Sequence, residues 1–121
     1  MAKSSVHDLK ARLARYRQIK ITVIGRKTGK AISIPVWFVL AGETIYLLPV
    51  QGSDTQWYRN VLKNPQIRIG APGAEASFRA VRITDAKTVK SVIEKFREKY
   101  GAKDVKKYYS KFDVAVAAAR D

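Results

Sequence analysis

The spacing of apolar positions changes several times along this chain, and each change predicts a new element. Over residues 1–18 the apolar side chains recur at helical spacing, on a stripe made of Val6, Leu9, Leu13 and Tyr16. From residue 19 apolar and polar residues alternate, which predicts strands joined by short turns. Five strands are expected in this part, over residues 19–25, 31–41, 44–50, 66–70 and 75–83. Because proline cannot donate to a ladder, Pro35 should lie at a sheet edge or a bulge.

Helical patterns interrupt and follow these strands. A short helix is predicted over 54–63, and the Asn64-Pro65 pair should end it. Residues 84–110 read as helices. The first of them has an apolar stripe and ends at Gly101; the stripe is Val89, Val92, Ile93, Phe96 and Tyr100. The last segment, 111–119, fits a helix or a strand, and its alternating valines favour a strand.

These elements predict one α+β domain over 1–121, mainly antiparallel β. Strands joined by short turns pair antiparallel, and closing the sheet would remove its exposed edges. The expected architecture is therefore a small six-stranded β-barrel flanked by helices, with an N-terminal helix at 1–18, barrel strands within 19–83 and the last strand at 111–119.

Composition narrows the chemistry. The 121 residues contain no cysteine and one histidine, which excludes disulfides, thiol catalysis and His-rich metal sites, so no metal is expected. The formal net charge of +14 favours anionic partners without choosing among them. No apolar leader follows Met1, and no apolar run could span a bilayer. A cytoplasmic protein without a transmembrane segment is expected.

The sequence G-R-K-T-G-K at residues 25–30 has two interpretations. A P-loop is excluded, because the glycine spacing is one residue short and a strand follows where a helix is required. The turn could still hold a phosphate with its backbone N–H groups and basic side chains. The alternative is a solvated basic hairpin tip.

Other polar and aromatic groups are equally open to two interpretations. The start of the short helix, near Gly52 and Ser53, could bind an anion, while Trp57 and Tyr58 could line a ligand or belong to the core. Tyr108 and Tyr109 follow several lysines and could stack on nucleotides or pack on the barrel. No acid–base pair or nucleophile triad can be assembled, so an enzyme built on this chain needs a cofactor.

Taken in order, three segments resemble the deazaflavin (F420)-dependent nitroreductase and quinone reductase family, within the FMN-binding split-barrel group. They are T-V-I-G-R-K-T-G-K from Thr22, I-P-V-W-F-V from Ile34, and W-Y-R-N-V-L-K-N-P from Trp57. The resemblance covers roughly residues 19–83. It implies a six-stranded split barrel, usually a homodimer, that binds coenzyme F420 or FMN against the barrel wall.

The resemblance also implies site residues. The hairpin would hold the cofactor phosphate, the proline-containing strand would face the ring, and the segment before W-Y would contact the phosphate or ribityl chain. The implied cofactor-binding residues are Arg26, Lys27, Thr28, Gly29, Lys30, Ile34, Pro35, Val36, Trp37, Gln51, Gly52, Ser53 and Trp57. Tyr58, Tyr108 and Tyr109 are candidate pocket tyrosines, and no residue is assigned a catalytic role.

The implied function is hydride transfer from reduced F420 or FMN to a small-molecule acceptor such as a quinone or nitro compound. The chain departs from the family pattern before W-Y, where the loop is short and lacks a lysine. Two alternatives therefore stay open: a small basic barrel that binds nucleic acid, and a family member that has lost its cofactor and has a binding or structural role.

Overall fold

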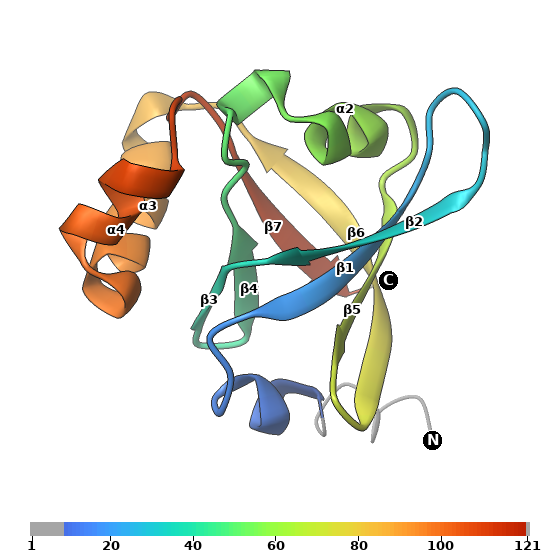
Figure 1. Ribbon diagram of the computed structural model, residues 1–121, viewed down its shortest axis with the longest axis horizontal. Coiled ribbons are helices and arrows are strands. Elements are labelled where there is room, and N and C mark those ends of the chain that lie inside the picture. The colour runs from blue at the N-terminus through green and yellow to red at the C-terminus, as the bar shows by residue number, and fades with distance from the viewer. Residues whose placement is uncertain (1–8, 121) are drawn as a thin grey trace.

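The computed structural model describes residues 9–120. Its strands form one antiparallel sheet, with helices along one side and at both ends (Figure 1). The elements are β1 (Ile19–Ile24), β2 (Ala31–Val36), β3 (Phe38–Ala41), β4 (Thr44–Leu47), a 3₁₀ turn η1 (Gly52–Asp54), α2 (Gln56–Lys63), β5 (Gln66–Ala71), β6 (Ala74–Ile83), α3 (Ala86–Tyr100), α4 (Ala102–Tyr108) and β7 (Ala115–Arg120). Residues 9–13 are helical and bury Leu9 and Leu13, whereas Val6 lies outside the described residues.

The α+β class and the antiparallel pairing are confirmed, but the closed six-stranded sheet is wrong. The described sheet has seven strands in the order β2-β1-β5-β6-β7-β4-β3, so β2 and β3 are its two edges. The extra strand arises because the predicted strand 31–41 is divided at Trp37. The part before Trp37 pairs with β1, and the part after it pairs with β4. Pro35 lies in an edge strand, as expected.

The backbone at this break is stabilised by the end of α3. The Phe38 N–H donates to the Tyr100 hydroxyl at 3.1 Å, and that hydroxyl lies 2.6 Å from the Arg17 carbonyl and 2.9 Å from the Phe38 carbonyl. Lys99 Nζ also donates to the Phe38 carbonyl, at 2.9 Å. Side chains of α3 therefore replace the ladder bonds that Phe38 lacks on the open edge of β3.

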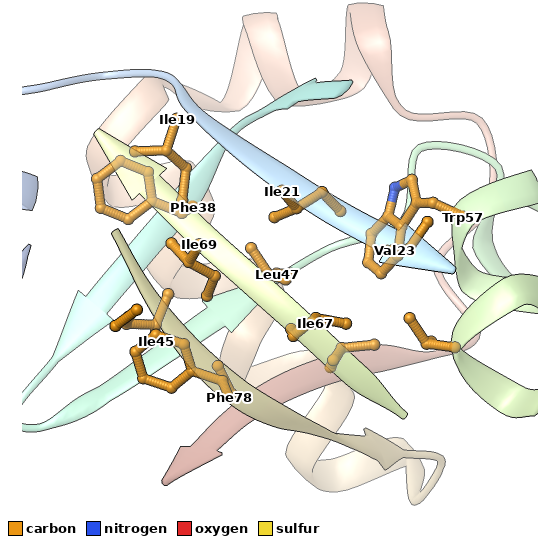
Figure 2. Close-up of a cluster of buried hydrophobic side chains, with 14 of the residues drawn as sticks. Ile19, Ile21, Val23, Phe38, Ile45, Leu47, Trp57, Ile67, Ile69 and Phe78 are labelled. Carbon is orange, nitrogen blue, oxygen red and sulfur yellow. The ribbon is translucent and has the colours of Figure 1, made fainter. Parts of the chain in front are cut away.

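The core has two parts, on opposite faces of the sheet. Inside the curled sheet, side chains of the strands point toward one another, among them Ile21, Leu47, Ile69 and Phe78 (Figure 2). On the outer face, Val39, Leu48 and Ala115 pack against α3 and α4. Because β3 is buried on both faces, its sequence is a continuous apolar run rather than an alternating one.

The buried faces of the helices agree with the prediction more closely than the residues at which the helices begin. All five residues of the predicted α3 stripe are buried, and the Asp85 side chain accepts from the Thr88 N–H at 2.9 Å. The short helix begins at Gln56 rather than residue 54, because Thr55 is extended and separates it from η1. It ends at Lys63, before Asn64-Pro65. Within the described residues, no helix is long and apolar enough to cross a membrane.

Candidate functional site

A cavity of about 470 Å³ opens where the chain passes from β2 to β3. Its lining combines the break between the edge strands, the start of α2 and the end of α4, segments far apart in sequence. The lining residues are Gln18, Ile34, Pro35, Val36, Trp37, Leu48, Val50, Trp57, Tyr108 and Tyr109. Seven of these are predicted site residues, so the structure brings together the predicted ring-facing segment, Trp57 and two of the three candidate tyrosines.

One wall of the cavity is an aromatic cluster around Trp37. The Trp37 ring stacks on Tyr100 with centroids 4.2 Å apart and planes 6° apart. Tyr108 meets it edge-on at 5.5 Å, and Tyr109 is tilted at 6.0 Å. These geometries are favourable for aromatic pairs. The wall is therefore a packed, preformed apolar surface.

Two buried side chains give this cavity hydrogen-bonding capacity. Trp57 and Tyr109 are 6% and 5% exposed and line the cavity. Neither the indole N–H nor the phenolic hydroxyl bonds to a residue within 9–120, yet no buried side-chain polar atom in that range lacks a partner, so both donors open onto the cavity. Burial raises the pKa of Tyr109 well above its ordinary value, with a smaller effect from Tyr100. Tyr109 therefore stays protonated at neutral pH and can donate a hydrogen bond to a ligand.

Tyr58 lies elsewhere. It is 2% exposed and belongs to the interior cluster of the sheet, so it is not part of the cavity wall. Burial raises its pKa, an effect that the charge of Arg82 partly opposes. Of the two interpretations that the sequence left open for Tyr58, its position agrees with a core residue.

The G-R-K-T-G-K hairpin extends from the far end of β2 (Figure 1). Most of its backbone donors are used inside the chain. The Gly25 N–H donates to the Lys30 carbonyl, the Gly29 N–H to the Gly25 carbonyl, and the Lys30 N–H to the Thr28 hydroxyl. The tip therefore offers an anion the exposed side chains of Lys27 and Lys30, rather than the backbone cradle that the sequence suggested.

Arg26 is turned toward α2. Its backbone N–H and its Nη1 both donate to Asn60 Oδ1, at 3.1 and 2.8 Å, and its Nη2 donates to Gln56 Oε1 at 2.8 Å. Lys63 Nζ donates to the Arg26 carbonyl at 3.2 Å. The motifs G-R-K-T-G and W-Y-R-N are therefore two halves of one contact, which fastens the hairpin to the helix.

The predicted phosphate-contact segment at Gln51, Gly52 and Ser53 has an internal partner. The Ser53 N–H donates to Asp113 Oδ1 at 2.9 Å, and the Ser53 hydroxyl donates to Asp113 Oδ2 at 2.6 Å. Although partial burial alone raises the pKa of Asp113, these bonds and the charge of Lys111 hold it below its ordinary value. A carboxylate of the chain thus holds the Ser53 donors that were expected to meet a phosphate.

The sequence did not single out Asn60, Gln18 or Asp113 as site residues. Asn60 stood within a quoted motif, and its burial at 6% is what reveals its role as an acceptor. Gln18 precedes the first strand and belongs to no sequence motif that would indicate a ligand site. Asp113 is sixty residues from Ser53, and no local pattern links the two.

The described residues contain no group of three or more side chains suited to hold a metal ion. A second, more open cavity of about 750 Å³ lies outside β1, β2 and the β5–β6 turn. It shares Gln18, Ile34 and Pro35 with the first, so the two cavities lie next to each other.

A family model described as "Uncharacterized protein conserved in bacteria (DUF2255)" matches residues 9–119. The chain belongs to this family. For this DUF2255 protein, a search of curated proteins found no match.

Several solved structures share the fold of the DUF2255 protein at low sequence identity. An F420-H2 dependent reductase (FDR-A) is 17% identical, with a TM-score of 0.66 over 84% of this chain and 93% of its own. A Listeria innocua protein provisionally assigned as a pyridoxamine 5′-phosphate oxidase is 15% identical, with a TM-score of 0.65 over 93% and 90%. A heme binding protein from Mycobacterium smegmatis is 12% identical, with a TM-score of 0.66 over 96% and 50%. At these identities the comparisons establish a split-barrel-like fold.

Proposed function

We propose that this DUF2255 protein is a flavin- or deazaflavin-binding oxidoreductase that transfers a hydride from reduced F420 or FMN to a quinone, nitro compound or similar small acceptor. The observation that carries the proposal is the aromatic cavity at the β2–β3 break, connected along one strand to a hairpin with free lysines. The F420-H2 dependent reductase with the same fold supports this chemistry.

The cavity suits a planar ring. Pro35, Val36 and Trp37 form one side, and Trp57 and Tyr109 add two donors that open onto the cavity. A ring that carries carbonyl oxygens could accept a hydrogen bond from each of these donors. The volume lies within the range typical of small-molecule sites.

The hairpin suits the phosphate of the same ligand. Lys30 and Ile34 are four residues apart on an extended chain, about 13 Å. A ligand with a ring in the cavity and a phosphate beyond a short chain could therefore follow β2 to the tip. No ion pair with a described residue engages Lys27 or Lys30.

In this proposal the bound cofactor supplies the hydride, and the chain supplies binding and orientation. Trp37 and Pro35 would fix the plane of the ring, and the surrounding apolar side chains would exclude water. The Tyr109 hydroxyl, protonated at neutral pH, would donate a hydrogen bond to an acceptor oxygen. Positioning of this kind can lower a barrier substantially without any acid–base residue.

The first test is a fluorescence titration of the purified protein with oxidised F420, with FMN in parallel. The double variant K27A/K30A should bind at least tenfold more weakly, a loss of about 1.4 kcal/mol. The matched control K87A/K90A removes the same charge from exposed positions of α3 and should bind as the wild type does. Equal weakening by both variants would show a general charge effect and reject the hairpin as the phosphate site.

The second test concerns the cavity. Val50 lines it and is 42% exposed, so V50W should fill the space without disturbing the core and abolish binding. V81W is the control, since Val81 on β6 is similarly exposed at 44% but lies outside the cavity. If V50W binds normally, the ring does not occupy this cavity.

A binding role without cofactor is the second candidate, and one observation favours it. Asp113 holds the Ser53 donors assigned to a phosphate. In that case neither F420 nor FMN would bind in the titration. We also propose a homodimer, which a neighbour described as a domain-swapped dimer supports and sedimentation analysis would test.

A further inference from the structure

The aromatic wall of the cavity has a property that ligand binding does not require. Trp37 and three tyrosines are in ring contact, with centroids between 4.2 and 6.0 Å apart. Tryptophan and tyrosine are the side chains that most readily lose a single electron, together with cysteine and methionine. Over such short separations an electron passes between rings quickly. The surroundings of each phenol then determine which tyrosine forms the final, stable radical.

The three tyrosines differ in whether their phenolic proton can leave. A tyrosine that loses an electron becomes a stable radical only if it also releases this proton. The Tyr100 hydroxyl faces the Arg17 and Phe38 carbonyls, which are poor bases, and the Arg17 guanidinium lies 5.1 Å from its ring centroid. Tyr109 is only 5% exposed and faces the cavity, so little of its phenol meets bulk water.

Tyr108 has the opposite surroundings. It is 54% exposed, whereas Tyr100 and Tyr109 are each 5% exposed, so water can receive its proton. It also lines the cavity and touches Trp37 edge-on at 5.5 Å. Of the three tyrosines in contact with Trp37, Tyr108 is by far the most exposed, so its proton has the most direct route to solvent.

We propose that Trp37 and Tyr108 form a one-electron relay that carries an oxidising equivalent from the cavity wall to the protein surface. A one-electron oxidant, such as a flavin radical or the azide radical, first takes an electron from the Trp37 indole. Trp37 then takes an electron from Tyr108, whose phenolic proton passes to water. In sum the oxidant gains one electron, and the Tyr108 phenol becomes a phenoxyl radical and a proton.

The relay would protect the cavity in a protein that handles redox-active molecules, because damage is moved to a surface residue that solutes can reduce again. The inference stands on ring geometry and exposure. It does not depend on which cofactor the cavity holds, and it can be tested on the full chain without one.

The experiment is pulse radiolysis with azide radical, which oxidises tryptophan in preference to tyrosine. In the wild type, the indolyl absorption should decay and the phenoxyl absorption should rise with one first-order rate constant that does not change with protein concentration. In Y108F this transfer should slow at least tenfold. In W37F, where Trp57 remains as a source of radicals, the fast phenoxyl rise should be absent.

Y109F is the matched control, because Tyr109 is the neighbouring ring in the same cluster and differs mainly in exposure. It should transfer at the wild-type rate. Circular dichroism and urea denaturation would establish that each variant is folded. Transfer in Y108F at the wild-type rate, loss of transfer in Y109F, or a rate proportional to protein concentration would each overturn the proposal.

Discussion

Arg26 and Asn60 are joined at two points through a single oxygen: the backbone N–H and the guanidinium of Arg26 both donate to Asn60 Oδ1. Thirty-four residues separate them in sequence. The side chain of Asn60 is therefore the fixed end of a contact that sets where the hairpin lies on α2. It also couples the conformation of the hairpin to the helix that begins beside the cavity.

Removing the Asn60 side chain should lower the free energy of unfolding more than removing the exposed Gln56 side chain. N60A leaves two donors of Arg26 without their partner at a buried position, so the free energy of unfolding should fall by about 1–3 kcal/mol. Q56A removes one bond at an exposed position and should cost about 0.5–1 kcal/mol. Urea denaturation of both variants measures the difference. Equal losses would mean that Asn60 is not the principal anchor.

The Tyr100 hydroxyl should be essential to the break between β2 and β3. In Y100F the Phe38 N–H, at a residue 1% exposed, loses its acceptor, and we expect a loss of about 1–3 kcal/mol in unfolding free energy. Y46F is the control, because Tyr46 on β4 is half-buried and its hydroxyl has no partner within the described structure. A Y100F protein as stable as Y46F would show that water can replace the hydroxyl.

Gly52 and Gly42 allow backbone strain to be separated from steric overlap. Both have positive φ, +55° and +59°, but a Cβ on Gly52 would lie 2.0 Å from Asp113 Oδ1, while nothing lies within 4 Å of one on Gly42. G42A should cost about 1–2 kcal/mol from the left-handed backbone, and G52A should cost clearly more.

A double-mutant cycle with D113A identifies the source of the excess. If the overlap with the carboxylate is responsible, G52A should be less destabilising in the D113A background than in the wild type. Independent, additive losses would place the excess elsewhere, for example at Lys111, whose Cγ is 3.0 Å from the same Cβ.

The contact between Ser53 and Asp113 should depend on pH. The pKa of Asp113 is held below its ordinary value of 3.8 in the folded state. The ionised carboxylate therefore stabilises the fold above the unfolded-state pKa, and this contribution is lost as the pH falls through the folded-state pKa. The wild type should exceed D113N in stability at neutral pH, and the gap should narrow toward about pH 3.

Urea denaturation of both proteins at the two pH values checks this prediction. Some acid dependence should remain in D113N, because the bonds and charges of Lys111 and Arg59 also lower the pKa of Asp54. A gap that stays constant or widens as the pH falls would contradict the assignment of the stabilising charge to Asp113.

The features that the sequence predicted well are those set by local pattern. The α3 stripe and the end of α2 before Asn64-Pro65 each depend on residues within a few positions of one another. The division of the long apolar strand could not be predicted in this way. Phe38 and Val39 are buried on opposite faces of the sheet, so the apolar run continues smoothly through the point where the strand changes partners.

The site shows the same distinction. The predicted ring-facing residues and Trp57 stand in contiguous stretches of sequence, and the cavity brings those stretches together. The partners of the hairpin and of Ser53 were missed, since Arg26–Asn60 and Ser53–Asp113 are contacts between distant parts of the chain. Residue type alone gives no sign of which carboxylate or amide will fold onto a given donor.

The short join at Trp37 has a mechanical consequence. The two outermost strands of an open sheet can usually drift apart, but here one residue links β2 directly to β3. The gap between these edges can widen at the end remote from Trp37, while at Trp37 it is limited by a covalent tether. We therefore expect the two edge strands to separate least at Trp37, beside the cavity, and most at their opposite ends.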